Sequence, residues 1–161
     1  MSGGLRYGST TSMPPGMRAM VERAIGQAER VASAGRAATG STHPSEHEEA
    51  CSLMTLVRSY ESEYPALELF YAIPNGGDRH KAVAGKMRAE GQRPGVPDYS
   101  LPVGRGTYHG LYIELKSLTG SPSREQKAWI IRLRAEGYRA EVARGAAQAW
   151  QILCEYLGIT P

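Results

Sequence analysis

Apolar residues at helical spacing mark the start of a folded region near residue 44. Ala50, Leu53 and Val57 fall on one face of a helix. Ser45 precedes this run, and a glutamate follows Ser45 three residues later, which is the pattern of a capping box. We therefore predict a helix that runs from the cap to about Ser62.

Short apolar runs predict three strands in the middle of the chain. Residues 67–73 are rich in strand-forming residues and end at a Pro-Asn-Gly-Gly turn. Residues 96–103 and 108–117 are separated by Gly-Arg-Gly-Thr, which favours a hairpin. The basic residues 78–90 predict a helix between the first and second strands, closed by Gly91.

The last third of the chain alternates between helix and strand. Ser123 is placed to cap a helix that ends before Gly137. Residues 138–143 then predict a strand, and residues 145–157 predict a closing helix. The order αβαββαβα predicts an α/β fold in which helices flank a mixed β-sheet.

The first 43 residues differ from the rest in composition. Residues 1–16 are rich in Gly, Ser, Thr and Pro, which predicts a disordered arm. Residues 17–38 favour a helix with a small apolar face, and residues 39–42 are typical of a linker. We therefore expect an N-terminal arm over 1–43 and one domain over 44–161.

Composition narrows the class of protein only slightly. The 161 residues carry a formal charge of +3 with a pI near 8.9, which is compatible with binding nucleic acid. No apolar run has transmembrane length and no signal peptide is evident, so we expect a cytoplasmic protein. Cys51 and Cys154 both fall in apolar helical patterns, which predicts two reduced, buried thiols.

The predicted hairpin brings two carboxylates and one ammonium group together. Glu114 and Lys116 lie two apart on a strand and therefore share a face. Asp98 follows a proline on the neighbouring strand, from which it can meet Glu114. Two carboxylates this close repel each other, and a hard cation such as Mg²⁺ removes that penalty. The carbonyl of Leu115 is a plausible third ligand, and Lys116 would orient a water or offset charge on a phosphate.

A plainer interpretation of this segment stays open at this point. Alternating apolar and polar residues are typical of a half-exposed strand, in which Glu114 and Lys116 form a solvated pair.

The remaining residues with distinctive chemistry favour structural roles. Trp129 and Trp150 are interpreted as packing residues rather than as platforms for stacked bases. The histidines lack the paired spacing of a zinc site, and they are His43, His47, His80 and His109.

Short blocks between Pro44 and Gly158 occur in the order seen in one nuclease family. They are Ser45-Glu46-His47, Ala72-Ile73-Pro74-Asn75-Gly76-Gly77, Glu90-Gly91, Gly95-Val96-Pro97-Asp98, Gly110-Leu111-Tyr112-Ile113-Glu114-Leu115-Lys116, Ser123-Arg124-Glu125-Gln126 and Gly137-Tyr138. By these blocks the chain resembles the VRR-NUC family of the PD-(D/E)xK nuclease superfamily. It is most similar to the compact stand-alone form encoded by phages and prophages.

The resemblance implies a restriction-endonuclease-like fold and a metal-dependent nuclease that hydrolyses DNA phosphodiester bonds with Mg²⁺ or Mn²⁺. It also implies a homodimer acting on branched, junction or flap DNA. Asp98 and Glu114 are the implied metal ligands, with Lys116 as the catalytic lysine.

The resemblance further implies that Glu46 completes the acidic cluster. Its place on the apolar face of the first helix predicts that it points inward, where a carboxylate needs a partner. Glu48 and Glu49 fall elsewhere and are interpreted as a capping residue and a solvated charge.

Gln126 admits two interpretations. Ser123-x-x-Gln126 is a capping box, which is a complete structural explanation. Gln126 also shares a face with Ile130 and Leu133, and the family places a glutamine beside the active site, in contact with the phosphate or Lys116.

A basic segment close to the predicted site favours contacts with the DNA backbone. Backbone N–H groups of residues 75–77 could hold a phosphate, although a simple turn that ends a strand explains them equally well. The predicted DNA-contacting residues are Asn75, Arg79, Lys81, Lys86, Arg88 and Arg93.

An alternative of another class is a non-catalytic module that binds nucleic acid, or is associated with packaging, and keeps the nuclease fold. Loss of Asp98, Glu114 or Lys116 would favour it, and all three are present.

Overall fold

A mixed, four-stranded sheet forms the centre of the computed structural model, which describes residues 19, 23, 26, 43–74 and 81–159. The elements are α2 (Glu46–Tyr60), the 3₁₀ helix η2 (Pro65–Leu69), β1 (Tyr71–Ala72), α3 (Lys81–Ala89), β2 (Tyr99–Leu101), β3 (Leu111–Lys116), α4 (Arg124–Ala135), β4 (Arg139–Arg144) and α5 (Gly145–Leu157). The predicted order αβαββαβα is confirmed, and the architecture is consistent with a restriction-endonuclease-like fold.

The strands lie in the order β1-β2-β3-β4. Strands β1, β2 and β3 are antiparallel neighbours, so the predicted hairpin between the second and third strands is present. Strand β4 then runs parallel to β3, after the crossover through α4.

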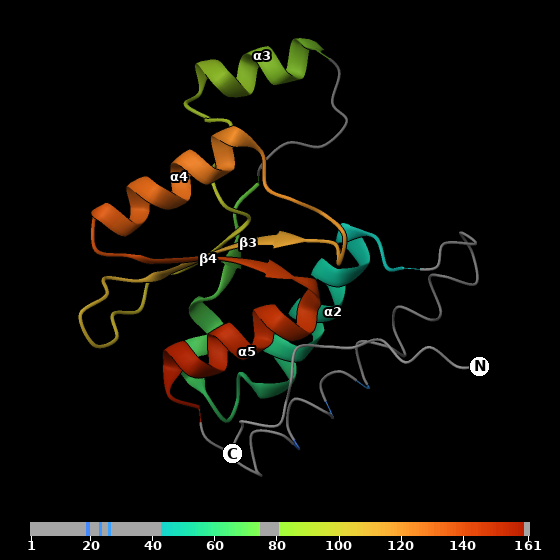
Figure 1. Ribbon diagram of the computed structural model, residues 1–161, viewed down its shortest axis with the longest axis vertical. Coiled ribbons are helices and arrows are strands. Elements are labelled where there is room, and N and C mark those ends of the chain that lie inside the picture. The colour runs from blue at the N-terminus through green and yellow to red at the C-terminus, as the bar shows by residue number, and fades with distance from the viewer. Residues whose placement is uncertain (1–18, 20–22, 24–25, 27–42, 75–80, 160–161) are drawn as a thin grey trace.

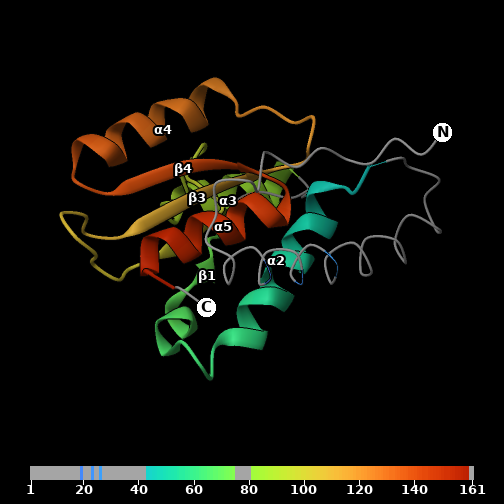
Figure 2. The same cartoon turned by 60° about the horizontal axis from the view of Figure 1, so that its bottom comes forward.

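Helices cover both faces of this sheet. Figures 1 and 2 show α4 on one side of β3 and β4, with α5 and α2 on the other side. The larger core lies on the α5 side and includes Leu53, Leu115 and Trp150. A smaller cluster of Ile130, Leu133 and Ala140 lies under α4.

Because both faces are covered, β3 is not a half-exposed strand. Glu114 has no exposed surface and Lys116 is 7% exposed. The interpretation of these residues as a solvated pair is therefore wrong.

The first predicted strand is shorter than expected. Residues 65–69 form a 3₁₀ helix with a proline in its first turn, and only Tyr71–Ala72 pair with β2. The N–H of Phe70 donates to the carbonyl of Leu67 and so closes the helical turn. The proline at the start of this segment favours a helical turn, and this local effect outweighs the strand preference of the side chains in residues 67–69.

The second strand is also shorter than the predicted 96–103. Pro97 and Pro102 flank Tyr99–Leu101 and have no N–H to give to a sheet, so regular pairing is confined between them.

Most helix boundaries follow the sequence. Ser45 and Ser123 both form complete capping boxes, and α5 spans the predicted residues 145–157. Helix α3 covers residues 81–89 of the predicted 78–90, and 78–80 lie outside the described residues. Residues 19, 23 and 26 are helical and residue 43 lies in a bend, whereas the rest of the predicted arm and linker lies outside the described residues.

Glu49 is buried, so its interpretation as a solvated charge is wrong. Its carboxylate accepts a 2.7 Å hydrogen bond from the backbone N–H of Ala146, in the first turn of α5. The N-terminus of a helix carries a partial positive charge and unpaired N–H groups, which stabilise a buried carboxylate. This contact ties α2 to α5.

The two thiols differ from the prediction in one respect. Cys154 is buried, but Cys51 is exposed on α2, and its sulfur lies 3.7 Å from Nε2 of His47. Cys51 occupies the solvent side of a helix whose other side faces the core, so its burial was predicted wrongly.

No helix in the described part of the chain is long and apolar enough to cross a membrane.

Gly95 brings the segment before β2 against the first turn of α4. A Cβ atom at Gly95 would lie 2.6 Å from the backbone carbon of Glu125 and 2.9 Å from the backbone nitrogen of Gln126. The φ of Gly95 is +84°, which also favours glycine. Only glycine therefore allows the close approach by which Asp98 and Gln126 both reach Glu114 on β3.

We expect Gly95→Ala to lower the free energy of unfolding by about 2–5 kcal/mol, from overpacking (about 1–3) and a strained positive φ (about 1–2). Gly91→Ala is the matched control, because Gly91 has φ +101° but open space around it. It should lose only the smaller, conformational part. Urea denaturation of both variants measures the difference, and equal losses would contradict the close packing against α4.

Candidate active site

The register of β2 and β3 sets two carboxylates side by side. Tyr99 pairs with Ile113, which brings Asp98 opposite Glu114 at the end of the paired region. Asp98 Oδ2 accepts a 2.9 Å hydrogen bond from the backbone N–H of Leu115. The Asp98 carbonyl accepts a 2.7 Å bond from the N–H of Ile73, so both sides of this residue are held.

Glu114 lies at the centre of the cluster. Its Oε1 is 2.6 Å from Nζ of Lys116 and also accepts a hydrogen bond from the amide of Gln126. Its Oε2 is buried and has no hydrogen-bond partner among the described residues. A buried carboxylate oxygen in this state is costly, and a proton or a cation would satisfy it.

Lys116 links the three carboxylates. Its ammonium group donates to the Leu115 carbonyl at 2.8 Å and lies 3.2 Å from both oxygens of Glu46. Oδ2 of Asp98 lies 4.0 Å away. A single cation therefore faces Glu46, Asp98 and Glu114 and offsets part of the cost of burying Glu114.

The environment shifts the ionisation of all three central groups. Burial raises the pKa of Glu114 to about 7, and the neighbouring charge of Asp98 adds to this, against the opposing effect of Lys116. Burial likewise raises the pKa of Asp98, although the Leu115 N–H and Lys116 lower it in part. Burial alone would lower the pKa of Lys116, but its contacts with Glu114, Asp98 and Glu46 raise it above the ordinary value. The site favours one retained proton on the carboxylate pair and a charged lysine.

Gln126 closes the predicted capping box and also reaches the cluster, through Glu114. Its Oε1 accepts from the N–H of Ser123 and so closes the capping box, while its Nε2 donates to Glu114. In the cluster, Gln126 is therefore hydrogen-bonded to Glu114 and not to Lys116. The cap fixes the amide in an orientation that presents a donor to the buried carboxylate.

Glu46 reaches the cluster from its rim. Its side chain is 49% exposed, so the prediction that it points inward is wrong, but it does contact Lys116. Glu46 sits at the first position of α2, where the helix emerges beyond the sheet and leaves one side of the residue open to solvent.

An open pocket of about 300 Å³ leads to these groups. Sequence reasoning gave no role to His47, which lines this pocket together with Glu46, Asp98 and the Leu115 segment. Its position one residue after Glu46 in the Ser-Glu-His block was the available signal.

The oxygen donors of the site fit a hard divalent cation. Asp98, Glu114 and the Leu115 carbonyl all lie within 4.0 Å of Nζ of Lys116, and Oε2 of Glu114 has no hydrogen-bond partner among the described residues. Within residues 43–74 and 81–159, no group of three or more His, Cys, Asp or Glu side chains is arranged to hold a metal. The protein therefore offers a carboxylate pair plus a carbonyl, and Glu46 lies against Lys116.

The predicted DNA-contacting residues are described only in part. Lys86, Arg88 and Arg93 are exposed on and just after α3, and Lys86 lies 3.9 Å from Glu90. Asn75, Arg79 and the side chain of Lys81 lie outside the described residues.

The comparisons with known proteins agree with this geometry. The VRR-NUC domain family matches residues 48–147. A solved structure described as a VRR_NUC domain protein is 27% identical, with a TM-score of 0.59, over 73% of this chain and 91% of that one. No curated protein matches the chain.

The raised pKa of Glu114 predicts a pH-dependent stability of the metal-free protein. The folded state holds the proton up to about pH 7 and the unfolded state only up to about 4.5, so the folded state binds more protons between these values. The contribution of Glu114 is thus fully present below pH 4.5 and is lost as the pH rises through 7.

Chemical denaturation in EDTA between pH 4.5 and 8 tests this expectation. The free energy of unfolding of the wild type should fall relative to that of Glu114→Gln across this range. If the difference between the two proteins does not change with pH, the protonated pair is refuted.

Proposed function

The chain belongs to the VRR-NUC domain family, a nuclease-type family, and from that premise we propose that it is a metal-dependent nuclease that hydrolyses DNA phosphodiester bonds. The observation that carries the proposal is the buried Glu114, held by Lys116 and Gln126 beside Asp98. Such an arrangement costs stability in a purely structural role, and clusters of this kind occur at functional sites.

We propose Mg²⁺ or Mn²⁺ as the cofactor, held by Asp98, Glu114 and the carbonyl of Leu115. Glu46 is a further candidate ligand that would have to leave Lys116 to serve. A divalent cation held by these oxygens would polarise the scissile phosphate and lower the pKa of a bound water. The chain's own contribution is a carboxylate pair that is fixed by the Leu115 N–H and by Gln126.

Lys116 is proposed as the catalytic lysine. Because its pKa is raised, it carries a positive charge at neutral pH. Its Nζ lies at the edge of the carboxylate pair, from which it can orient the attacking water or offset charge on the phosphate. Glu46 and the Leu115 carbonyl hold the ammonium in place.

The proposed substrate is branched or otherwise structured DNA, bound by a homodimer. Similarity to the family supports this choice, since a two-fold dimer presents two sites to two strands. The exposed basic residues after β1, namely Lys86, Arg88 and Arg93, are proposed to contact the DNA backbone. A cytoplasmic location remains a prediction from the sequence.

Substitutions at Asp98 and at Lys116 distinguish the proposed role of the metal from that of the lysine. Asp98→Ala should abolish both Mn²⁺ binding in calorimetry and DNA cleavage, whereas Lys116→Ala should keep Mn²⁺ binding and lower the cleavage rate by at least about 100-fold. Lys127→Ala is the matched control, because Lys127 is an exposed lysine on α4 one residue after Gln126. It should cleave as the wild type does.

Circular dichroism must show that each variant folds. Cleavage by the wild type in excess EDTA would refute the metal mechanism. Absence of Mn²⁺ binding and cleavage in the folded wild type would instead favour a non-catalytic nucleic-acid-binding module.

A panel of labelled DNAs tests the proposed substrate. Junction, flap, nicked and linear duplex DNA of the same sequence are incubated with the protein in Mg²⁺ and in Mn²⁺. The structured DNAs should be cleaved faster than the linear duplex at equal protein concentration. Equal rates on all four would contradict the preference for structured DNA and leave the nuclease chemistry standing.

A further inference from the structure

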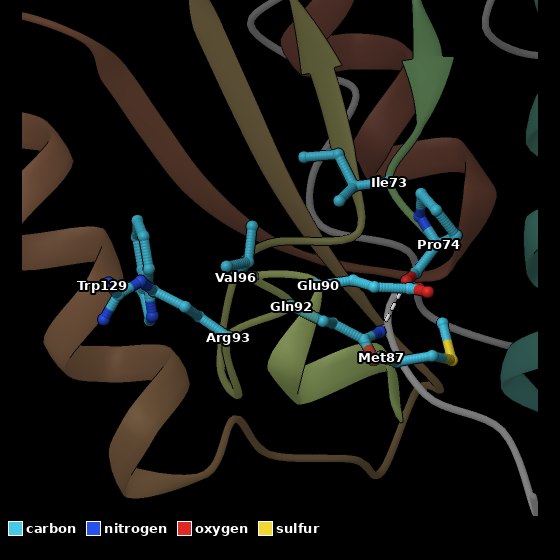
Figure 3. A pocket seen from close by; sticks show the side chains of 9 residues that line it. Ile73, Pro74, Met87, Glu90, Gln92, Arg93, Val96 and Trp129 are labelled. Carbon is cyan, nitrogen blue, oxygen red and sulfur yellow. Dashed lines mark hydrogen bonds between the residues drawn. The ribbon is translucent and has the colours of Figure 1, made fainter. Parts of the chain in front are cut away.

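A second cavity, of about 380 Å³, lies next to the proposed catalytic site (Figure 3). Its walls come from the end of β1, the end of α3, the segment before β2 and the middle of α4. The apolar lining is formed by Ile73, Pro74, Met87, Val96 and Trp129. This volume is within the range of roughly 300–1,000 Å³ that is typical of small-ligand pockets.

This cavity and the catalytic pocket share a wall. Ile73 lines both, and its N–H donates to the carbonyl of Asp98. Trp129 lies three residues after Gln126 on α4, so the two side chains are neighbours on the helix surface. A ligand in the cavity would therefore lie beside whatever occupies the site at Asp98 and Glu114.

The aromatic wall is held in place rather than free to move. Nε1 of Trp129 donates a 2.9 Å hydrogen bond to the carbonyl of Pro94, which satisfies the indole's only donor. Trp129 is half-buried and packs against the small cluster under α4, as the sequence predicted, and it also lines the cavity. A pre-positioned indole of this kind suits a flat, aromatic ligand.

Polar groups are present at the same cavity. Nε2 of Gln92 donates a 2.7 Å hydrogen bond to the carbonyl of Pro74, and the side-chain oxygen of this residue is an acceptor at the cavity. Arg93 is exposed and forms no ion pair with a carboxylate in the described part of the chain. The carboxylate of Glu90 also lines the cavity, and Nζ of Lys86 lies 3.9 Å from it and offsets part of its charge. An acceptor and the positive charge of Arg93 beside an apolar wall match a nucleobase that is attached to a phosphate.

We propose that this cavity binds one unpaired nucleobase of the DNA strand whose phosphate lies at the catalytic site. The base stacks against Trp129, and Arg93 faces the adjoining phosphate. A paired and stacked base cannot present its flat face to the indole, so the cavity favours single-stranded or splayed DNA. This proposal rests on the proposed nuclease function, since that function brings DNA to the neighbouring site.

Equilibrium binding in EDTA tests the cavity without requiring cleavage. Fluorescence anisotropy compares a labelled single-stranded oligonucleotide with the same strand in which every base is replaced by an abasic site. The wild type should bind the intact strand about tenfold more tightly or better, because base–aromatic stacking is sequence-tolerant and depends on the base.

Trp129→Leu should lose most of this preference for the intact strand while it keeps the affinity for the abasic strand. Tyr108→Leu is the matched control, because Tyr108 is an exposed aromatic residue in the loop between β2 and β3 and does not line the cavity. It should discriminate as the wild type does. Trp129→Phe should restore part of the preference and so exclude a merely structural effect.

Equal affinity of the wild type for both strands overturns the proposal, as does unchanged discrimination in Trp129→Leu. The outcome is separable from the fate of the nuclease itself. Discrimination without cleavage in Mg²⁺ would retain the base pocket and reject the catalytic function. Cleavage without discrimination would reject the pocket alone.

Discussion

The burial of one carboxylate constrains the rest of this structure. Glu114 has no exposed surface, and a buried charge is tolerated only with a proton, a counter-charge or hydrogen bonds. Lys116 supplies the counter-charge and Gln126 supplies a hydrogen bond. The raised pKa of Glu114 allows the carboxylate pair to keep a proton close to neutral pH. Lys116 comes from the same strand as Glu114, whereas Gln126 comes from α4.

The frame around Glu114 consists of close backbone contacts. Gly95 lets the segment before β2 touch the first turn of α4, which brings Asp98 and Gln126 to the same strand. On the other side of the sheet, Glu49 binds the N-terminus of α5 and so fixes the helix that carries Glu46. Glu46 and Glu49 lie three residues apart on α2 and have different roles. Glu46 contacts Lys116 at the rim of the site, and Glu49 binds α5 in the core.

Local signals in the sequence predicted much of this arrangement. The two capping boxes, the closing helix and the order of elements depend on residues within a few positions of one another, so the sequence contains them directly. The alternation Glu-x-Lys and the hairpin predicted which side chains share a face of β3. The family blocks then indicated which of these side chains belong to one site.

What the sequence did not reveal depends on distant partners. Glu49 is buried because the N–H of Ala146, far along the chain, donates to its carboxylate. No residue near Glu49 in the sequence indicates this contact. The sequence left Gln126 with two interpretations because its side chain makes two different contacts. Its oxygen accepts from the N–H of Ser123, a neighbour in the sequence, whereas its nitrogen donates to Glu114, which depends on the packing of α4 on β3. The exposure of Cys51 likewise follows from which side of α2 packs against the core.

The central claim is that a proton on the Asp98–Glu114 pair occupies the place of a divalent cation. Calorimetric titration of Mn²⁺ at pH 6.5, in two buffers of different ionisation enthalpy, measures the protons released on binding. We expect the wild type to release a measurable fraction of a proton, or more, for each Mn²⁺ bound, and Glu114→Gln to release none. Mn²⁺ binding by the wild type without any proton release would contradict it.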